Sequence, residues 1–262
     1  MPIAIATRVL KLDSAGMTAE SRNFPQFFIT APGPCPYLPG QEERKVFTHL
    51  LGPDPRALNS QLSQGGFRRS QNIAYRPGCE SCNACSSVRV PIKDFEWTQS
   101  FRRVLKDNAD LVAGVKSPLA TQEHYDLFRS YIDTRHADGG MADMSVIDFA
   151  AMIDETMVET RLFEYRYVKS HPKGGQLAAA VLVDVLHDGL SLIYSFFEPD
   201  EAQRSLGTFV VLDCLKRAQS LNLTYLYLGF LVQGSRKMAY KARFLPQERL
   251  GPHGWQLHKR YG

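Results

Sequence analysis

One stretch in the second half of this 262-residue chain constrains its fold more than any other part. Two apolar runs rich in strand-forming residues, Leu177–Leu186 and Leu190–Phe197, flank an Asp-Gly pair, which is typical of a β-hairpin. A helix is predicted over Ser205–Leu221 and a further strand over Thr224–Phe230. Because a strand–helix–strand connection gives a parallel pair, the stretch predicts an antiparallel meander followed by one parallel strand. The last two strands can then splay apart and admit a substrate between them.

This order of elements resembles the core of the GNAT acyltransferases. We therefore predict an α+β fold: a GNAT-like acyltransferase core, with a mixed, mostly antiparallel sheet and flanking helices, plus a small cysteine-containing N-terminal α/β unit. Residues 1–98 are assigned to the N-terminal unit, for substrate recognition, and residues 99–262 to the transferase domain with its basic C-terminal segment. The segment Arg204–Phe209 resembles the GNAT pyrophosphate loop but ends in a bulky ring. Such a ring hinders approach of a phosphate to backbone amides, which predicts an acyl donor other than acetyl-CoA.

Charge is distributed unevenly along the chain, although the formal net charge is only +4. Residues 1–110 carry a balance of +4, residues 111–230 one of −6 and residues 231–262 one of +6. Basic ends around an acidic middle suit a protein that binds a polyanion, and a solvated basic tail is the alternative. No apolar run is long enough to span a bilayer, and the N-terminus lacks the pattern of a signal peptide. These features predict a cytoplasmic protein with reduced cysteines.

Four of the five cysteines lie in the N-terminal part, at Cys35, Cys79, Cys82 and Cys85. The C-x-x-C-x-x-C spacing can place three thiolates around one centre, and a distant fourth cysteine can complete it. Zinc or an iron–sulfur cluster is therefore one interpretation. The alternative is that these side chains pack as small apolar groups, as we expect for Cys214 in the later helix.

The other segments predict short helices and strands around this core. Their boundaries follow from apolar periodicity, from capping residues and from the helix-ending glycines. The predicted helices are Gln41–Leu51, one that starts at Asp54 and ends at Gly65, one from Ser100 through Val112, and two that start at Thr121 and Ser145; the predicted strands are Phe27–Ile29, Phe67–Arg76, Ser87–Ile92 and Leu162–Val168.

The segment from Gly229 to Phe244 is basic, with aromatic residues between the cations. Cations reach phosphates and rings stack on unpaired bases, so this pattern is typical of a contact with a single-stranded RNA end. A helix that uses Met238 and Phe244 as core contacts is the alternative, and both interpretations are compatible.

An ordered series of motifs along nearly the whole chain matches a known family. The chain resembles the aminoacyl-tRNA–protein transferases of the N-degron pathway, in particular the bacterial branch of aspartate/glutamate leucyltransferases. The matching motifs are Cys35–Gly40, Gly66–Ser70, Tyr75-Arg76-Pro77, Cys82–Arg89, Arg135-His136, Gly140-Met141, Tyr194–Pro199, Ser205–Thr208, Gly229-Phe230 and Lys237–Lys241.

The resemblance implies that leucine is transferred from leucyl-tRNA to the α-amine of proteins that begin with Asp or Glu, which marks them for degradation. It implies aminoacyl-tRNA and such proteins as partners, neither a membrane nor DNA, and no cofactor required for the chemistry. An iron–sulfur cluster is associated with the eukaryotic arginyl branch, whose cysteine pattern differs from the one in this chain. An arginyl-tRNA–protein transferase, a CoA-dependent N-acetyltransferase and a non-catalytic metal-centred RNA-binding module are the alternative functions.

An α-amine with a pKa of roughly 8 attacks an activated ester with little help beyond positioning and charge stabilisation. Glu198 is the predicted general base, and Tyr194 and Tyr227 can hydrogen-bond the amine or the ribose. A guanidinium can bind the carboxylate of the acceptor Asp or Glu bidentately. The candidates for it are Arg76 first, beside Tyr75, and then Arg68, Arg69, Arg89 and Arg135; those for the tRNA acceptor end are Lys237, Tyr240, Lys241 and Arg243.

Overall fold

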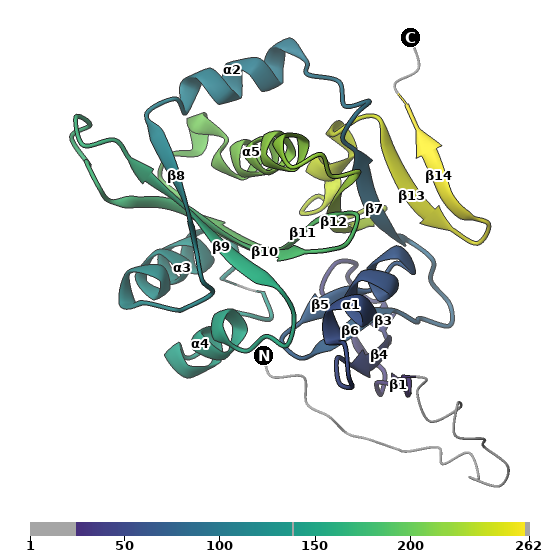
Figure 1. Cartoon of the computed structure of the whole chain (residues 1–262). Coiled ribbons are helices and arrows are strands. Elements are labelled where there is room, and N and C mark those ends of the chain that lie inside the picture. Colours follow the sequence, from purple (N-terminus) through teal and green to yellow (C-terminus); the bar gives the residue numbers. More distant parts are fainter. Residues whose placement is uncertain (1–24, 138, 260–262) are drawn as a thin grey trace, which may run out of the picture.

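The computed structural model describes residues 25–137 and 139–259. Its largest sheet has eight strands in the order β14-β13-β7-β12-β11-β10-β9-β8 and forms the middle layer of the molecule (Figure 1). These strands are β7 (Cys85–Pro91), β8 (Leu111–Lys116), β9 (Thr160–Tyr167), β10 (Leu177–Val185), β11 (Gly189–Phe197), β12 (Tyr225–Val232), β13 (Gln247–Gly251) and β14 (Gly254–His258). Only β11 and β12 pair in parallel among the described strands of this sheet, which confirms the predicted mixed, mostly antiparallel sheet.

The meander and the crossover helix lie where the sequence predicts them. β9, β10 and β11 pair in sequence order, and helix α5 (Leu206–Ser220) connects β11 to β12. The parallel pairing is short, from Gly189 opposite Tyr225 to Ser191 opposite Tyr227. Beyond these residues the two strands do not pair with each other in the described chain, so the predicted splay is confirmed.

Alternating side chains give the sheet two covered faces. On β9, Phe163 and Tyr165 pack with α5 and helix α2 (Gln99–Asp107), whereas Leu162 packs with helices α3 (Gln122–Arg135) and α4 (Val146–Asp154). Figure 1 shows α2 and α5 on one face of the sheet and α3 and α4 on the other. The end of α3 and the start of α5 both lie near the C-terminal end of β11.

The N-terminal part forms a second, four-stranded sheet in the order β1-β4-β6-β5. Its elements are β1 (Phe28–Ile29), β4 (Lys45–His49), α1 (Pro55–Gln64), β5 (Arg68–Ser70) and β6 (Ile73–Pro77), with a two-stranded piece of β2 (Gly33–Pro34) and β3 (Glu42–Glu43) beside them. β7, which the predicted division assigns to this unit, pairs with β12 and β13 in the large sheet. The sheet of the transferase core therefore includes a strand that precedes residue 98, and the division into domains stays a prediction.

Three predicted elements differ from the structure. The helix predicted over Gln41–Leu51 is wrong, because β3 and β4 occupy this segment and β4 pairs with β6; short apolar runs do not distinguish helix from strand by periodicity alone. The single strand predicted over Phe67–Arg76 is a hairpin of β5 and β6, which turns at Gln71 with a positive φ of 49°. The helix predicted to run through Val112 is capped by Thr98 and ends at Asp107, before the edge strand β8.

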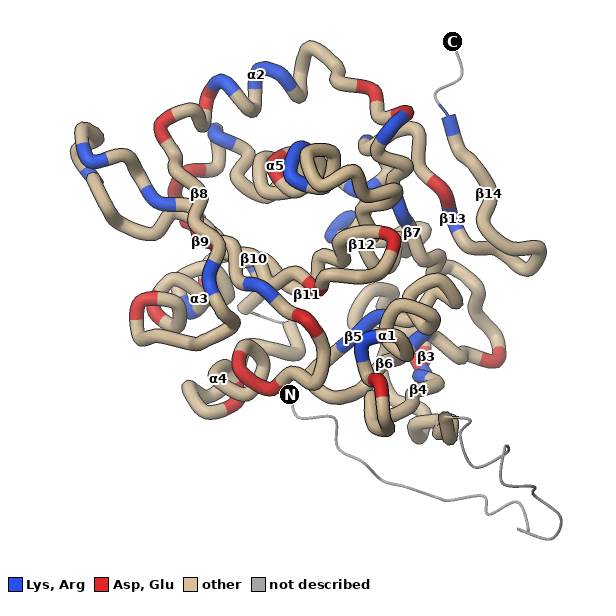
Figure 2. The backbone as a smooth tube through the Cα atoms, viewed as in Figure 1, with Lys and Arg blue, Asp and Glu red and all other residues tan. Residues whose placement is uncertain are grey.

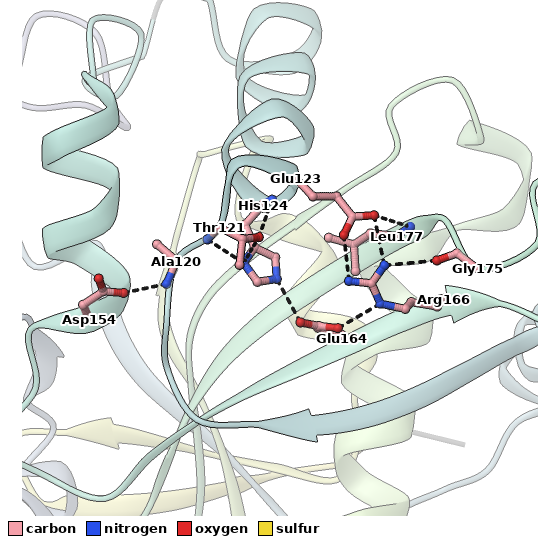
Figure 3. Close-up of polar contacts among 9 residues, drawn as sticks. All are labelled: Ala120, Thr121, Glu123, His124, Asp154, Glu164, Arg166, Gly175 and Leu177. Atoms are coloured by element: carbon pink, nitrogen blue, oxygen red, sulfur yellow. Dashed lines mark hydrogen bonds and ion pairs between the residues drawn. The ribbon is translucent and has the colours of Figure 1, made fainter.

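A network of polar groups fixes the start of α3 to the sheet (Figure 3). Thr121 caps the helix, and Nδ1 of His124 accepts the backbone N–H of Thr121 at 3.1 Å. Because this ring nitrogen accepts, the other one, Nε2, carries the proton and donates to Glu164 on β9 at 3.0 Å. Arg166 on the same strand donates to the second oxygen of that carboxylate at 2.9 Å. The network holds α3 in place and so positions its last turn, which contributes to the site.

Among the described residues, no helix combines the length and the apolar character needed to cross a membrane.

Candidate active site

The split between β11 and β12 contains a β-bulge on each strand. Register shifts leave Ile193 as an extra residue on β11, opposite β10, and Leu228 as an extra residue on β12, opposite β7. The carbonyls of both residues accept hydrogen bonds from one side chain, Arg68 on β5. Its Nη1 donates to Leu228 O at 3.4 Å and its Nη2 donates to Ile193 O. The guanidinium of Arg68 therefore bridges the two parting strands.

Side chains fill the split between β11 and β12, so it is not the open substrate entrance that the sequence predicts. Gly229 has a φ of +73°, and a Cβ at this position would lie 2.8 Å from Cζ of Arg68, so only glycine leaves room for the guanidinium. Nζ of Lys241, whose side chain is buried, donates to the carbonyl of Phe230 at 2.8 Å. Burial, with the charge of Arg68 as a second cause, lowers the pKa of Lys241 well below its usual range.

A cavity of about 450 Å³ lies beside the split, at the end of β11 and the N-terminus of α5. We call it the transfer pocket. Its walls are the end of β11 (Ser195 and Phe197), the turn before α5 (Glu201 and Ala202), the start of α5 (residues 205–208), the last turn of α3 (Tyr131, Arg135 and His136) and the segment after β12 (Lys237 and Tyr240). The first N–H groups of a helix have no i−4 partner within the helix. The N–H of Thr208 donates to Ser205 O at 2.9 Å, so Leu206 and Gly207 are the residues whose backbone N–H groups the start of α5 can offer to this cavity. The pocket thus combines donors, cations and an imidazole.

The ionisable groups of the transfer pocket have distinct charge states. The Tyr131 hydroxyl lies 3.1 Å from Nε2 of His136, and burial raises the pKa of Tyr131 to about 12, so this hydroxyl keeps its proton at neutral pH. Glu201 accepts hydrogen bonds from Lys173 at 2.8 Å and from the hydroxyl of Tyr167 at 3.2 Å. The bond from Lys173 lowers the pKa of Glu201, which therefore stays ionised and is a weak base. His136 is the group in this pocket whose residue type suits proton transfer near neutral pH.

A second cavity, of about 380 Å³, brings together the four N-terminal cysteines. We call it the cysteine pocket. It is lined by Cys35, Cys79, Cys82 and Cys85, by Tyr37, Tyr75 and Glu43 of the N-terminal unit, and by Phe230 of β12. Burial, followed by the proximity of the other three cysteines, raises the pKa of Cys85 to about 11. The cysteines are free and close enough to influence one another.

The arrangement of the cysteine pocket does not by itself form a coordination shell. Among the described residues, no group of three or more His, Cys, Asp or Glu side chains is placed to hold a metal ion. The four thiols share one pocket, but their donor atoms do not converge on one point as a tetrahedral zinc site requires. Zinc or an iron–sulfur cluster at these cysteines stays a prediction.

Two of the arginines predicted to bind the acceptor hold the fold together by buried ion pairs. Arg69 and Asp184 form a fully buried bidentate pair, with N–O distances of 2.6 and 2.8 Å, between β5 and β10. Arg89 is buried, donates to Glu248 at 2.6 Å and lies 3.7 Å from the centre of the Tyr225 ring. Figure 2 shows the cationic positions of β5 beside α1. Arg69 and Arg89 are therefore engaged with partners inside the protein, and their role in binding the acceptor stays a prediction.

Arg76, the first-ranked candidate, does not line either pocket. Its exposed side chain donates to Gly65 O at 3.4 Å and lies over the ring of Phe67. Its neighbours Tyr75 and Pro77 line the cysteine pocket instead, because successive side chains of a strand point to opposite faces. Among the predicted acceptor-binding arginines, Arg135 is the one that lines the transfer pocket.

The predicted catalytic residues lie outside the transfer pocket. Tyr194 packs against Phe128 and Phe196 on the α3 side of the sheet. The hydroxyl of Tyr227 donates to Asp188 at 3.0 Å and accepts from Arg89, before the strands part. Glu198 follows β11, where its backbone N–H donates to Ala178 O, and does not line the cavity. The general base predicted from the sequence thus lies outside the pocket lining, and its role stays a prediction.

The loop before α5 disfavours a bound pyrophosphate for a different reason from the one expected. The ring of Phe209 is buried and packs edge-on against Tyr165, 5.3 Å between ring centres, so it does not cover the first amides of the helix. The guanidinium of Arg204 is instead held by Asn108 at 3.0 Å and by Asp110. The arginine that the resemblance would place on a pyrophosphate is therefore engaged inside the protein.

The C-terminal segment is divided between core and surface. Lys237 and Tyr240 line the transfer pocket, and Arg243 is exposed over the ring of Phe101. Their contact with the tRNA end stays a prediction. Lys241 is buried and donates to the carbonyl of Phe230, and a direct contact with tRNA stays a prediction for it. A short 3-10 turn, Ala239–Arg243, replaces a regular helix, and Phe244 is a core residue as the alternative interpretation expected.

Tyr131, His136 and Glu201 also line the transfer pocket, although the sequence did not indicate them as site residues. His136 stands in an Arg-His pair just before a glycine-rich loop, and this context was the available signal. Tyr131 gave none, because an aromatic residue at helical spacing predicts a core contact.

The meander, the crossover helix, the split strands and the pocket at the start of α5 define a GNAT-like acyltransferase. Two family models match the chain: the N terminus of arginine-tRNA-protein transferase over residues 33–103 and its C terminus over residues 123–251. The chain therefore belongs to the arginine-tRNA-protein transferase family, whose members are enzymes.

Two similar relatives are named aspartate/glutamate leucyltransferase. One, from Azorhizobium caulinodans, is 58% identical over 245 residues, which cover 92% of this chain and 98% of the relative. The other, from Xanthobacter autotrophicus, shows the same identity and coverage. Solved structures with a partial likeness include L-PGS from Bacillus licheniformis (TM-score 0.41, 8% identity, 55% of this chain and 44% of that one) and FemX (TM-score 0.45, 10% identity, 71% and 63%).

Proposed function

We propose that this enzyme transfers leucine from leucyl-tRNA to the α-amine of proteins that begin with Asp or Glu. The observation that carries the proposal is the 58% identity, over almost their full length, to relatives named for this donor and these acceptors. The transfer pocket supports it, because it places an imidazole, an arginine and a lysine at the start of α5. We also propose that the reaction takes place in the cytoplasm, where charged tRNA is available.

The proposed reaction is an aminolysis of an ester. The neutral α-amine of the acceptor attacks the carbonyl carbon of the leucyl ester, the new C–N bond forms, and the carbonyl oxygen becomes an oxyanion. The intermediate then collapses, the C–O bond to the ribose breaks, and the ribose oxygen leaves with a proton. The backbone donors at the start of α5 are suited to stabilise the oxyanion, because they are fixed before the reaction begins.

The pair of Tyr131 and His136 is suited to move the proton. As the amine becomes an amide it loses a proton, which the Tyr131 hydroxyl can take while it passes its own to Nε2 of His136, 3.1 Å away. The same relay, run in reverse, returns a proton to the departing ribose oxygen. In this proposal His136 replaces Glu198 as the general base, since Glu198 does not line the pocket.

Arg135 and Lys237 are the proposed substrate-binding cations. Arg135 offers a guanidinium to the carboxylate of the acceptor's first side chain. Lys237 lines the pocket together with Tyr240, where an ammonium can contact a phosphate of the tRNA end and the ring can stack on its last base. These assignments explain how one pocket can receive an acidic acceptor and a polyanionic donor.

One experiment tests donor and acceptor together. The protein is mixed with radiolabelled leucyl-tRNA or arginyl-tRNA and with peptides that differ only in a first residue of Asp, Glu, Lys or Arg. The proposal expects label from leucyl-tRNA on the Asp and Glu peptides alone. Label from arginyl-tRNA would make the enzyme an arginyltransferase, the function that the name of the family model favours. Transfer from acetyl-CoA, with neither tRNA active, would contradict the proposal altogether.

The role of the four cysteines is a separate proposal. We propose that any metal centre at these residues is structural, because the proposed aminolysis needs none and the cysteine pocket is distinct from the transfer pocket. Metal analysis and absorption spectra of protein purified without oxygen, for the native chain and for Cys82→Ser, distinguish zinc, an iron–sulfur cluster and free thiols. Loss of transfer on removal of a metal from a protein that stays folded would contradict a structural role.

A further inference from the structure

Two strands that part from each other supply walls of the transfer pocket. β11 ends in Ser195 and Phe197, which line one wall, and the segment that leaves β12 supplies Lys237 and Tyr240. The width of the pocket therefore depends on how far β11 and β12 stand apart. Backbone pairing fixes this distance only up to Ser191 and Tyr227.

Beyond that point the side chain of Arg68 connects the strands. Arg68 donates to Ile193 O on β11 and to Leu228 O on β12, and both acceptors are the extra residues of β-bulges. The contact at Gly229 shows that β12 is shaped around the guanidinium, since no other residue fits beside it at a φ of +73°.

Arg68 is itself held firmly in this position. The next residue, Arg69, is locked to Asp184 on β10 by a buried bidentate pair, and β5 is paired with β6 along its length. The connecting cation therefore projects from a fixed point in the N-terminal unit. A second cation, Lys241, satisfies another carbonyl of β12, that of Phe230.

We infer that Arg68 is a positioning residue for the transfer reaction: by bridging the bulges of β11 and β12 it sets the width of the transfer pocket. The expected effect on the rate rests on the proposed function. The expected effect on the structure of β11 and β12 does not. Without the guanidinium the two carbonyls lose their donor, and the strands either close on each other or admit water. Either change moves the pocket walls, and a displacement of about 1 Å can reduce a rate by roughly 100-fold.

The test compares Arg68→Ala and Arg68→Lys with Arg56→Ala, an exposed arginine in helix α1 of the same unit. For Arg68→Ala we expect kcat to fall by roughly 100-fold while KM for leucyl-tRNA and for the peptide changes by less than about threefold. Added guanidinium ion, at concentrations far below those that unfold the protein, should restore part of kcat in Arg68→Ala and none in the native enzyme. Arg68→Lys should remain impaired, because the lysine side chain is shorter overall and ends in a single nitrogen, which cannot reach both carbonyls.

Hydrogen–deuterium exchange supplies a readout that does not depend on activity. In Arg68→Ala, peptides that cover β11 and β12 should exchange at least about tenfold faster, while those that cover β9 and β10 stay as in the native protein. A native enzyme without any transfer activity would refute the proposed function, and the exchange data would still decide the role of Arg68. Native kcat in a folded Arg68→Ala, native exchange in β11 and β12, or a loss confined to KM would each overturn the inference. If Arg68→Ala does not fold, the same measurements on Arg68→Lys decide it.

Discussion

The junction between the N-terminal unit and the large sheet and the transfer pocket both gather cationic side chains, but the two regions use them differently. At the junction, defined by Arg68 and Arg69, and at Arg89 of the adjoining strand β7, each guanidinium has its partners inside the protein. At the transfer pocket, Arg135 and Lys237 are exposed and line a cavity. Whether a cation supports the fold or is available to a substrate therefore depends on what surrounds its side chain, and not on its type or its place in a motif.

The largest effect that separates the two regions is on stability, and it is expected at Arg69. Arg69→Ala leaves the buried carboxylate of Asp184 without its cationic partner, which should lower the free energy of unfolding by about 3–5 kcal/mol. Urea denaturation measures this change. Arg56→Ala, at an exposed arginine 3.8 Å from its carboxylate partner, should change it by less than about 0.5 kcal/mol. A loss of similar size in both variants would show that the junction does not depend on its buried pair.

In the transfer pocket the largest expected effect is on the rate. His136→Ala removes the proposed proton acceptor and should lower kcat by roughly 100-fold, with the free energy of unfolding little changed. Tyr131→Phe removes the hydroxyl through which the proposed relay runs, so it should lower kcat to a similar extent. Single-turnover transfer of labelled leucine measures both, and His253→Ala, an exposed histidine in the β13–β14 turn, is the matched control. An unchanged rate in His136→Ala would remove this residue from the mechanism.

A smaller effect, on acceptor affinity, is expected at Arg135. Arg135→Ala loses a charge-assisted contact and should raise KM for a peptide that begins with Asp by about 10–100-fold, while KM for leucyl-tRNA stays the same. Arg135→Lys should retain part of the affinity, because it keeps the charge but not the bidentate geometry. The control is Arg103→Ala, an exposed arginine on α2. A rise in KM for the tRNA alone would reassign Arg135 from the acceptor to the donor.

The smallest expected effect concerns the cysteine pocket, on the junction side of the molecule. The pKa of Cys85 is raised to about 11, against about 8.5 for a thiol in an unfolded chain. Well below a pH of about 8.5, Cys85 is therefore a protonated thiol in both the folded and the unfolded chain, and it adds no pH dependence to the free energy of unfolding there. Between about pH 8.5 and 11 only the unfolded chain ionises fully, so stability falls as the pH rises through this window.

Alkylation with iodoacetamide, followed by mass spectrometry, tests the state of Cys85. At a pH of about 8.5 Cys85 should react on the order of 100-fold more slowly in the folded protein than in urea, and its rate should keep rising toward a pH of about 11. The unfolded chain is the internal control. A rate that levels off near a pH of about 8.5 would contradict the raised pKa, and protection at every pH that a chelator abolishes would show a metal on these cysteines.

The sequence predicts the core of the fold well because the signals there are local. The Asp-Gly turn, the apolar runs around it and the helix between β11 and β12 each depend on residues close in the chain, and the structure has them within about two residues of their predicted ends. The prediction fails over residues 41–51, where pairing with the distant β6 makes a strand of a short apolar segment. It also fails at β13 and β14, which had no local signal strong enough to predict.

The cations predicted for the site fall into two groups for the same reason. Lys237, Tyr240 and Arg135 were predicted to bind substrates, and they do line the transfer pocket. Arg69, Arg89 and Lys241 were predicted with them on the same grounds, yet they are buried on internal partners. No property of the residues themselves separates the two groups, since both contain cations in motifs of the family.

The sequence by itself determined the class of fold, the family and the set of residue types available to the site. Hydrophobic periodicity, turn chemistry and ordered motifs are properties of neighbouring residues, so they can be read along the chain. The tertiary structure alone decided that Arg68 bridges two bulged strands, that Arg69 pairs with Asp184 and that His136 meets Tyr131 at the pocket. The physical reason is that the role of a charged side chain depends on which carbonyl, carboxylate or solvent it meets, and these partners come from parts of the chain that only folding brings together.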